Sequence, residues 1–288
     1  MTRKRERGWG RARAFVELWG ELFARHNLLT WASAIAFQVL VALVPLTVLA
    51  LGILGALDER SVWTKQISPP IERRLPGPTW GAVDYAATLI LTHATAGLLA
   101  FGAVLTIWEI SGSVRAIMGA LNRMYETDED RPIWVRFGTS FALAIAIGVS
   151  LIGAALVLTV SKHLGGSLHA LVSVGRWILA VLLVGAAVEL LVRFAPAERR
   201  PKKWVTLGSA FTVVAWIVAS LIFRVYVSSV ANFRSTFGSF IAVLVLTAYL
   251  YTSAIVFLVG VQADELIRAA PARGQQGFFG RIAAALGQ

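Results

Sequence analysis

Residues 31 to 57 read WASAIAFQVLVALVPLTVLALGILGAL, a run of 27 residues without an Asp, Glu, Lys or Arg. An α-helix rises about 1.5 Å per residue, so roughly 20 apolar residues cross a hydrocarbon core of about 30 Å. The run is therefore long enough to span a bilayer. It is also too long for the apolar part of a cleaved signal peptide, so we expect it to remain in the mature protein as a membrane helix.

Comparable charge-free runs recur along the chain, at residues 85–108, 137–161, 204–223 and 235–263. A weaker sixth run, residues 172–194, carries Glu189 and has Arg176 near its start. Apolar residues make up 57% of the chain and charged residues 15%, against about 25% charged in a typical soluble domain. These patterns predict an all-α polytopic membrane protein with six transmembrane helices. The expected spans are 31–57, 86–114, 135–160, 172–194, 204–230 and 239–264.

Three segments fall outside the predicted spans or between them. Residues 1–30 are basic, and their Trp9, Val16 and Trp19 recur at helical spacing, which predicts an interfacial cytoplasmic helix. The connection between the first two spans contains four prolines, which predicts a small cap on the outside. The chain is thus expected to comprise residues 1–30, a membrane domain at 31–268, and a cytoplasmic tail at 269–288.

Basic residues are distributed unequally between the two ends of the predicted spans. With six spans, 19 of the 27 Lys and Arg residues fall on the side that holds both termini, and eight fall on the other. The positive-inside rule then places both termini in the cytoplasm. The net charge of +11 could also indicate nucleic acid binding, but the basic residues lie next to span ends. Anionic lipid headgroups at the cytoplasmic face explain that placement, so we expect membrane lipids and no nucleic acid as partners.

The sequence contains no recognisable catalytic or metal-binding pattern. Its four histidines form no i, i+4 pair, cysteine is absent, and neither a nucleophile elbow nor a phosphate-cradling loop occurs. We therefore expect no enzymatic activity, no cofactor and no metal.

Polar residues within spans are better candidates, because a charge at the centre of a span costs about 2.5 to 3.5 kcal/mol on insertion scales. Pro45 removes a backbone hydrogen bond from the first span, which predicts a kink close to Gln38. A kinked polar helix suits the wall of a cavity, although a purely structural kink is the alternative. The candidate cavity residues are Gln38, Pro45, Glu109, Glu189, Arg193, Arg224, Gln262 and Asp264.

These candidates are expected to form a polar cluster at the inner end of the bundle. Glu109 and Glu189 should belong to it, with Arg193 or Arg115 as the counter-charge, whereas Arg224 should stand apart near the outer mouth. The alternative interpretation places Asp264 and Arg193 in the interface and lets Arg224 reach outward to the headgroups.

The carboxyl-terminal half shows an internal similarity. Residues 134–152 match residues 204–222 at an offset of 70, and residues 183–197 match residues 258–272 at an offset of 75. The matches include Trp, Gly, Arg and Pro residues, which predicts that the last two helical hairpins are parallel copies, an arrangement known in transporters. Chance matching between helices rich in Ala and Val is the alternative.

Several short motifs together resemble the YihY/BrkB family of bacterial inner-membrane proteins. They are Ala36-Phe37-Gln38 with Leu40, Leu43 and Pro45, then Leu121-Asn122-Arg123, then Phe237-Gly238-Ser239, and finally Tyr251, Ser253 and Gly260. The chain departs from the family pattern at Ala42, where Ser is frequent, and at Gln262, where Glu is frequent. The resemblance implies a six-helix inner-membrane protein with both termini in the cytoplasm.

The resemblance also implies a role in the cell envelope. Family members are described as virulence factors, as suspected transporters, or under an old ribonuclease BN label. RNA hydrolysis needs a metal cluster or paired acid-base groups, and the sequence offers neither. We therefore expect a transporter-like or flippase-like protein for an amphiphilic or anionic substrate. A non-transporting scaffold that organises lipids or partner proteins is the alternative: a ligand-sized cavity would favour transport, and a solid bundle would favour the scaffold.

Overall fold

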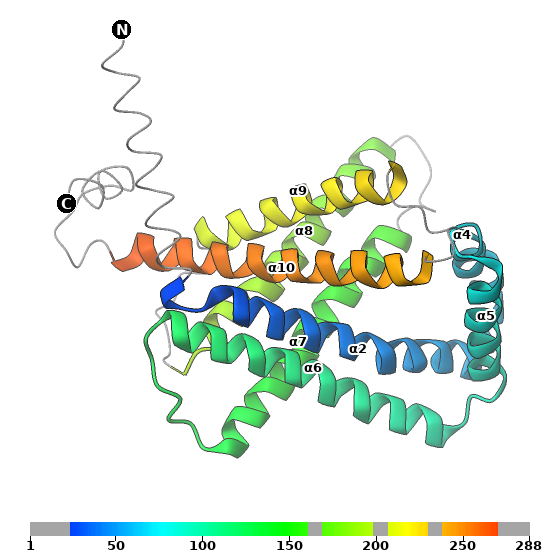
Figure 1. Cartoon of the computed structure of the whole chain (residues 1–288), viewed down its shortest axis with the longest axis horizontal. Helices are drawn as coiled ribbons and strands as arrows, with labels where there is room; N and C mark the ends of the chain where they lie inside the picture. Colours follow the sequence, from blue (N-terminus) through cyan, green and yellow to red (C-terminus); the bar gives the residue numbers. More distant parts are fainter. Residues whose placement is uncertain (1–23, 161–168, 198–206, 230–237, 270–288) are drawn as a thin grey trace, which may run out of the picture.

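The computed structural model describes residues 24–160, 169–197, 207–229 and 238–269. Its helices are α2 (Leu28–Ala56), α3 (Arg60–Val62), η1 (Trp63–Ile67), α4 (Ser68–Glu72), α5 (Gly77–Thr92), α6 (Ala96–Met124), α7 (Ile133–Val160), α8 (His169–Phe194), α9 (Leu207–Ser229) and α10 (Gly238–Ala269). The described part of the chain contains no strand, so the predicted all-α class is confirmed (Figure 1). The predicted interfacial helix at 1–30 and the tail at 269–288 lie almost entirely outside the described residues.

Six helices, α2 and α6 to α10, are long and apolar enough to cross a membrane, as predicted. In the most apolar stretch of 18 residues of each helix, only 17% to 28% of the residues are buried inside the protein. The outward side chains include Phe37, Val44, Phe101, Trp134 and Val214, each more than half exposed. Apolar surface of this extent has to be covered, and lipid tails cover it in a polytopic membrane protein.

The second span begins ten residues later than predicted, because residues 86–92 belong to a separate helix. α5 ends at Thr92, and the side chain of Thr95 caps α6 by accepting a hydrogen bond from the backbone N–H of Leu98 at 3.2 Å. A Thr cap of this kind starts a new helix, and it leaves no trace in the charge pattern. α6 also continues past the predicted end at residue 114 to Met124, so Glu109 lies near its middle instead of close to its end.

The cap between the first two spans is ordered and consists of α3, η1, α4 and α5. α5 stands across the ends of the long helices (Figure 1). Trp63 stacks on Trp80 with ring centroids 6.2 Å apart, and its indole N–H donates to Asp84 at 3.0 Å. The cap docks closely on α2: a Cβ at Gly55 would lie only 2.4 Å from the carbonyl oxygen of Leu91. Only glycine fits at that position.

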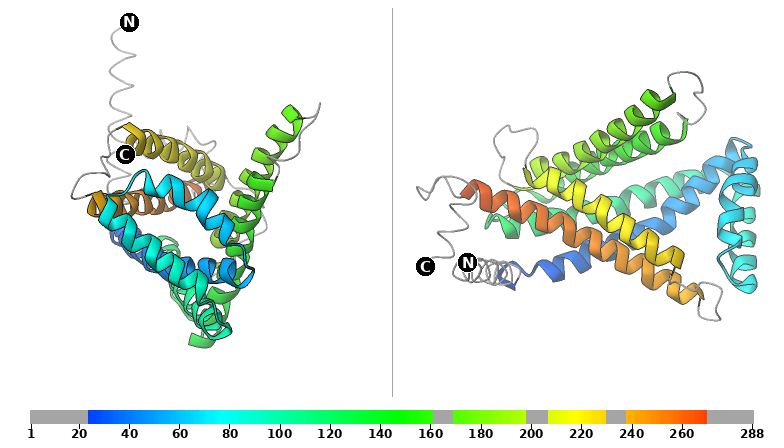
Figure 2. Two further views of the ribbon diagram at one scale, coloured as in Figure 1. Left: turned by 90° about the vertical axis from the view of Figure 1, so that its right-hand side faces the viewer. Right: turned by 90° about the horizontal axis from the view of Figure 1, so that it is seen from above.

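The long helices pack tightly at one end of the bundle, where α2 begins, which we call the Leu28 end. α2 packs between α6 and α10, α6 also contacts α7, and α7–α8 and α9–α10 form two hairpins. The core is centred at this end, where Leu28, Met118, Leu121 and Leu258 are fully buried. From there the two hairpins diverge toward the cap (Figure 2). Both hairpins start at the Leu28 end, and their predicted superposition stays a prediction.

Candidate functional site

Arg115 is a cation well inside a membrane-length helix. It lies nine residues before the end of α6, which corresponds to about 14 Å along the helix axis. Its Nη1 donates a hydrogen bond to the Ser111 hydroxyl one turn earlier. The guanidinium lies over the ring of Phe137 on α7, 4.4 Å from its centroid, and 5.7 Å from the ring centroid of Trp108. Two aromatic faces and one hydroxyl therefore fix the position of this charge.

A chain of hydroxyl groups holds Ser111 in place. Ser140 of α7 donates to the Phe137 carbonyl at 2.8 Å, and the Ser111 and Ser140 oxygens are 2.9 Å apart. Since the Ser140 proton is used on the backbone, Ser111 donates to Ser140 and is left to accept from Arg115. Both serines are fully buried. The direction of this chain orients Ser111 as an acceptor.

Gly112 leaves room beside Arg115 for the side chain of Gln38 on α2. A Cβ at Gly112 would lie 2.8 Å from the Gln38 Oε1 and 3.6 Å from the Arg115 Nη2. The amide and the guanidinium thus both lie beside a position without a side chain. Gln38 was predicted on a kinked helix that suits the wall of a cavity, and the structure directs its side chain toward Gly112 of α6.

The charges around Arg115 do not balance. Arg136 on α7 and Glu109 on α6 are the charged groups that act on it electrostatically. Within the described residues the ion pairs are Arg25–Glu126, Arg60–Asp58 and Arg131–Glu129, so Glu109 is not in contact with either arginine. Arg136 also acts electrostatically on Glu129, which Arg131 binds, so three arginines face two carboxylates and one positive charge remains in the group.

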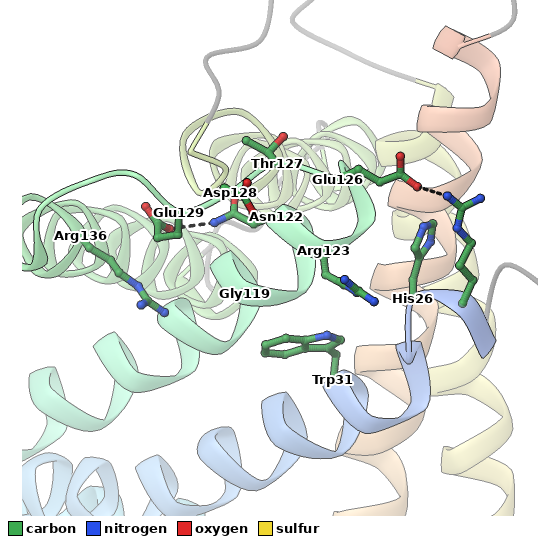
Figure 3. A pocket seen from close by; sticks show the side chains of 11 residues that line it. His26, Trp31, Gly119, Asn122, Arg123, Glu126, Thr127, Asp128, Glu129 and Arg136 are labelled. Atoms are coloured by element: carbon green, nitrogen blue, oxygen red, sulfur yellow. Dashed lines mark hydrogen bonds and ion pairs between the residues drawn. The ribbon is translucent and has the colours of Figure 1, made fainter.

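A pocket of about 540 Å³ opens at the Leu28 end, and we call it the Leu28-end pocket (Figure 3). Its lining comes from the residues just before α2, from α2, α6 and α7, and from the α6–α7 connection: Arg25, His26, Trp31, Gly119, Asn122, Arg123, Glu126, Thr127, Asp128, Glu129 and Arg136. Buried His26 meets buried Gln262 of α10, with Nδ1 and Oε1 2.9 Å apart. Arg136 lines this pocket and also acts on Arg115, so it connects the pocket with the intramembrane charge.

Asn122 organises the side of the pocket next to α8. Its Nδ2 donates to Glu129 at 2.8 Å, and its Oδ1 accepts from the backbone N–H of Ala197 at 2.8 Å. Arg131 binds both oxygens of Glu129, at 2.6 and 2.7 Å, and also donates to the Ala195 carbonyl at 2.9 Å. The hydrogen bonds from Arg131 are the main cause that lowers the pKa of Glu129, and Asn122 adds to them. This clamp ties the end of α6 to the end of α8.

The remaining predicted residues lie in different places. Pro45 is buried inside the continuous helix α2. Glu189 and Arg193 are half-buried on α8, where the Arg193 guanidinium lies 5.1 Å from the ring centroid of Phe194. Arg224 is exposed on α9, and the side chain of Asp264 lies outside the described ones. The structure therefore groups Gln38 and Glu109 with Arg115, and Gln262 with His26.

Sequence reasoning missed the second arginine and the groups that hold the first one. Neither Arg136 nor Trp108 is among the candidate residues predicted from the sequence. A usable signal was present, because Trp108, Ser111 and Arg115 recur at spacings of three and four and so share one face of a helix. The described residues contain no group of three His, Cys, Asp or Glu side chains that could hold a metal ion.

These features define a multi-pass α-helical membrane protein with a polar site inside its bundle. The chain belongs to the virulence factor BrkB family, whose model matches residues 21–277. The predicted resemblance is thereby confirmed.

Curated relatives of the chain carry two kinds of name. The putative ribonuclease-like protein YfkH of Bacillus subtilis is 27% identical over 260 residues, which cover 86% of this chain and 94% of YfkH. A UPF0761 membrane protein of Alkalilimnicola ehrlichii is 26% identical and one of Stenotrophomonas maltophilia is 23% identical. The matches cover 56% and 64% of these two proteins, so the chain spans less than two thirds of their length. No solved structure matches the chain.

Proposed function

We propose that this protein is a transporter-like or flippase-like protein of the bacterial inner membrane, and that it moves an amphiphilic substrate with an anionic head. In this proposal both termini are cytoplasmic, so the Leu28 end faces the cytoplasm, in line with the distribution of basic residues. The observation that carries the proposal is the guanidinium of Arg115, which is positioned inside a span and contacts no carboxylate among the described residues.

The energetics favour a functional role for this charge. A span-centre Arg costs about 2.5 to 3.5 kcal/mol on insertion scales. Partial compensation comes from its hydrogen bond and from the rings of Phe137 and Trp108, at about 0.5 to 2 kcal/mol for a cation over an aromatic face. A purely structural arginine would be expected to pair with Glu109. A transported anion would supply the missing partner.

The exposed apolar surface of α6 and α7 suits the apolar part of such a substrate. On α6, Phe101, Val104 and Trp108 are exposed, and on α7, Trp134 and Ile145 are exposed. Acyl chains would remain against these side chains in the lipid while the head approaches Arg115. This division matches the needs of an amphiphile, because the charged part is screened and the tails stay in hydrocarbon.

A non-transporting scaffold is the second candidate. The tightly packed core at the Leu28 end supports it, since Met118, Leu121 and Leu258 are fully buried there. No catalytic step is included in either proposal. The word ribonuclease in the name of YfkH concerns that protein, and the described part of this chain contains no group of three His, Cys, Asp or Glu side chains that could hold a metal ion.

Reconstitution separates transport from scaffolding. The purified full-length chain is placed in phosphatidylcholine vesicles that contain a fluorescent, headgroup-labelled phosphatidylglycerol, and dithionite then bleaches the outer leaflet. A transporter makes the protected half of the probe accessible over minutes, whereas protein-free vesicles keep it protected. Protection that equals that of protein-free vesicles would favour the scaffold. A labelled phosphatidylcholine in parallel vesicles controls for non-specific leakage around membrane helices.

A further inference from the structure

Arg115 has N–H donors that it does not use within the described residues. A guanidinium carries five N–H groups, and within the described residues Arg115 uses one of them, from Nη1 to Ser111. Its side chain is only half-buried, and its other nitrogens are not among the buried atoms that lack a partner. The remaining N–H groups of the guanidinium are therefore open to a ligand, while the rings of Phe137 and Trp108 fix the orientation of the guanidinium plane.

Arg136 presents a second incomplete guanidinium on the neighbouring helix. Its Nε is buried and donates to no acceptor in the described part of the chain. Two arginines that act on each other electrostatically repel, and the repulsion is strong where water is scarce. An anion between them would remove this repulsion and supply acceptors to both.

We propose that Arg115 and Arg136 form a binding site for a singly charged phosphate group, such as the phosphodiester of a lipid head. This inference rests on the proposed function for its setting, and it adds the headgroup chemistry. Glu109 and Glu129 together leave one net positive charge among Arg115, Arg131 and Arg136, so a phosphodiester monoanion makes the group neutral. A phosphate also offers acceptor oxygens in several directions, which suits two guanidinium groups on different helices. The two oxygens of a carboxylate are used by a single guanidinium in a bidentate pair.

The Leu28-end pocket provides access to this site. Arg136 lies in the pocket wall opposite His26, with Trp31 and Gly119 between them (Figure 3). A phosphate that enters the pocket of about 540 Å³ meets Arg136 first and has Arg115 deeper along the same pair of helices. Ser111 and Ser140 do not contact the ligand in this proposal, because their protons are used within the hydroxyl chain. They act as positioning residues for Arg115.

Lipid binding measured by native mass spectrometry tests the site without any need for transport. The full-length chain in detergent is titrated with phosphatidylglycerol and, separately, with phosphatidylcholine, whose choline cation makes the head neutral. We expect wild type to prefer phosphatidylglycerol. Arg115→Gln and Arg136→Gln should each weaken its binding by about tenfold or more, the value of a lost hydrogen bond to a charged group. Arg74→Gln, at an exposed arginine of the cap, removes the same charge far from the site and should leave binding unchanged.

A conservative variant and a competition experiment test the proposal further. Arg115→Lys retains the positive charge and loses the planar guanidinium, so it should bind phosphatidylglycerol with intermediate affinity. This variant replaces Arg115→Gln if Arg115→Gln does not fold. Glycerophosphoglycerol, the head without tails, is added as a competitor. If the competitor displaces phosphatidylglycerol and this displacement requires Arg115, a soluble phosphodiester is sufficient for binding. If phosphatidylglycerol binding requires Arg115 but the competitor does not displace it, the site takes its phosphate from a lipid.

Unchanged phosphatidylglycerol binding in Arg115→Gln, Arg115→Lys and Arg136→Gln would overturn the site. Both lipids carry a phosphodiester, so equal binding by wild type would overturn the preference for a head with a net negative charge. If binding depends on both arginines but labelled lipid does not cross the vesicle membrane, the site stands and the transport proposal fails.

Discussion

Arg115 and Arg224 both lie within membrane-length helices, but their surroundings differ. Arg115 of α6 is half-buried, bonded to Ser111 and covered by the rings of Phe137 and Trp108. Arg224 of α9 is exposed, and its neighbours Val225 and Tyr226 are exposed as well. It lies five residues before the end of α9, about 8 Å along the axis, so its side chain can reach the headgroups. Burial against a second helix, rather than charge alone, distinguishes a functional cation from a snorkelling one.

The comparison depends first on topology, because Arg115 lies nearer the Leu28 end and Arg224 nearer the cap. We expect an all-or-none result from cysteine labelling in intact cells. Cysteine at exposed Ser61 of the cap should react with a membrane-impermeant reagent added outside, and cysteine at exposed Glu126 of the Leu28 end should react only after permeabilisation. The opposite pattern would invert the proposed orientation and place Arg115 near the outer face.

The next largest effect should separate the two arginines in transport. Arg115→Gln should slow the movement of labelled phosphatidylglycerol by about tenfold or more, because the head loses its charged partner inside the span. Arg224→Gln should stay close to the wild-type rate, since that side chain is exposed at the lipid-facing surface. Vesicle flotation checks that both variants insert equally. Equal slowing by both substitutions would show that overall charge, and not the Arg115 site, controls the rate.

Seven residues after Arg115, Asn122 is expected to matter for stability. Asn122→Ala removes hydrogen bonds to Glu129 and to the Ala197 N–H, and leaves partners without their bonds at a buried position. We expect a loss of about 1 to 3 kcal/mol in the free energy of unfolding. Thermal unfolding in detergent measures it, with Thr127→Ala, an adjacent side chain that bonds only within its own turn, as the matched control. Identical melting curves for both variants would refute the clamp.

A smaller effect is expected from pH. Because Arg131 lowers the pKa of folded Glu129, its contribution to stability is complete above the unfolded value of about 4.3 and is lost as the pH falls through the lower folded value. The melting temperature of wild type should therefore exceed that of Glu129→Gln at pH 7, and the gap should close as the pH is brought down to 3. A gap that widens in acid would contradict the assigned direction of the shift.

The sequence was sufficient for the fold and only partly for the site. Long charge-free runs predicted six spans, because span length follows from bilayer thickness. They could not show the break before Thr95, where a local cap divides two equally apolar helices, or the continuation of α6 to Met124, and Glu109 was misplaced along its helix as a result. The meeting of Gln38 with Gly112, and of Arg115 with Phe137, depends on contacts between helices that no single sequence specifies.

The most direct test of a phosphate site at Arg115 is an experimental structure of the chain in nanodiscs that contain phosphatidylglycerol. The account predicts phosphate density within hydrogen-bonding distance of both Arg115 and Arg136, with acyl density along the exposed apolar face of α6 and α7. A direct ion pair between Arg115 and Glu109, with lipid tails filling the space between α6 and α7, would contradict it.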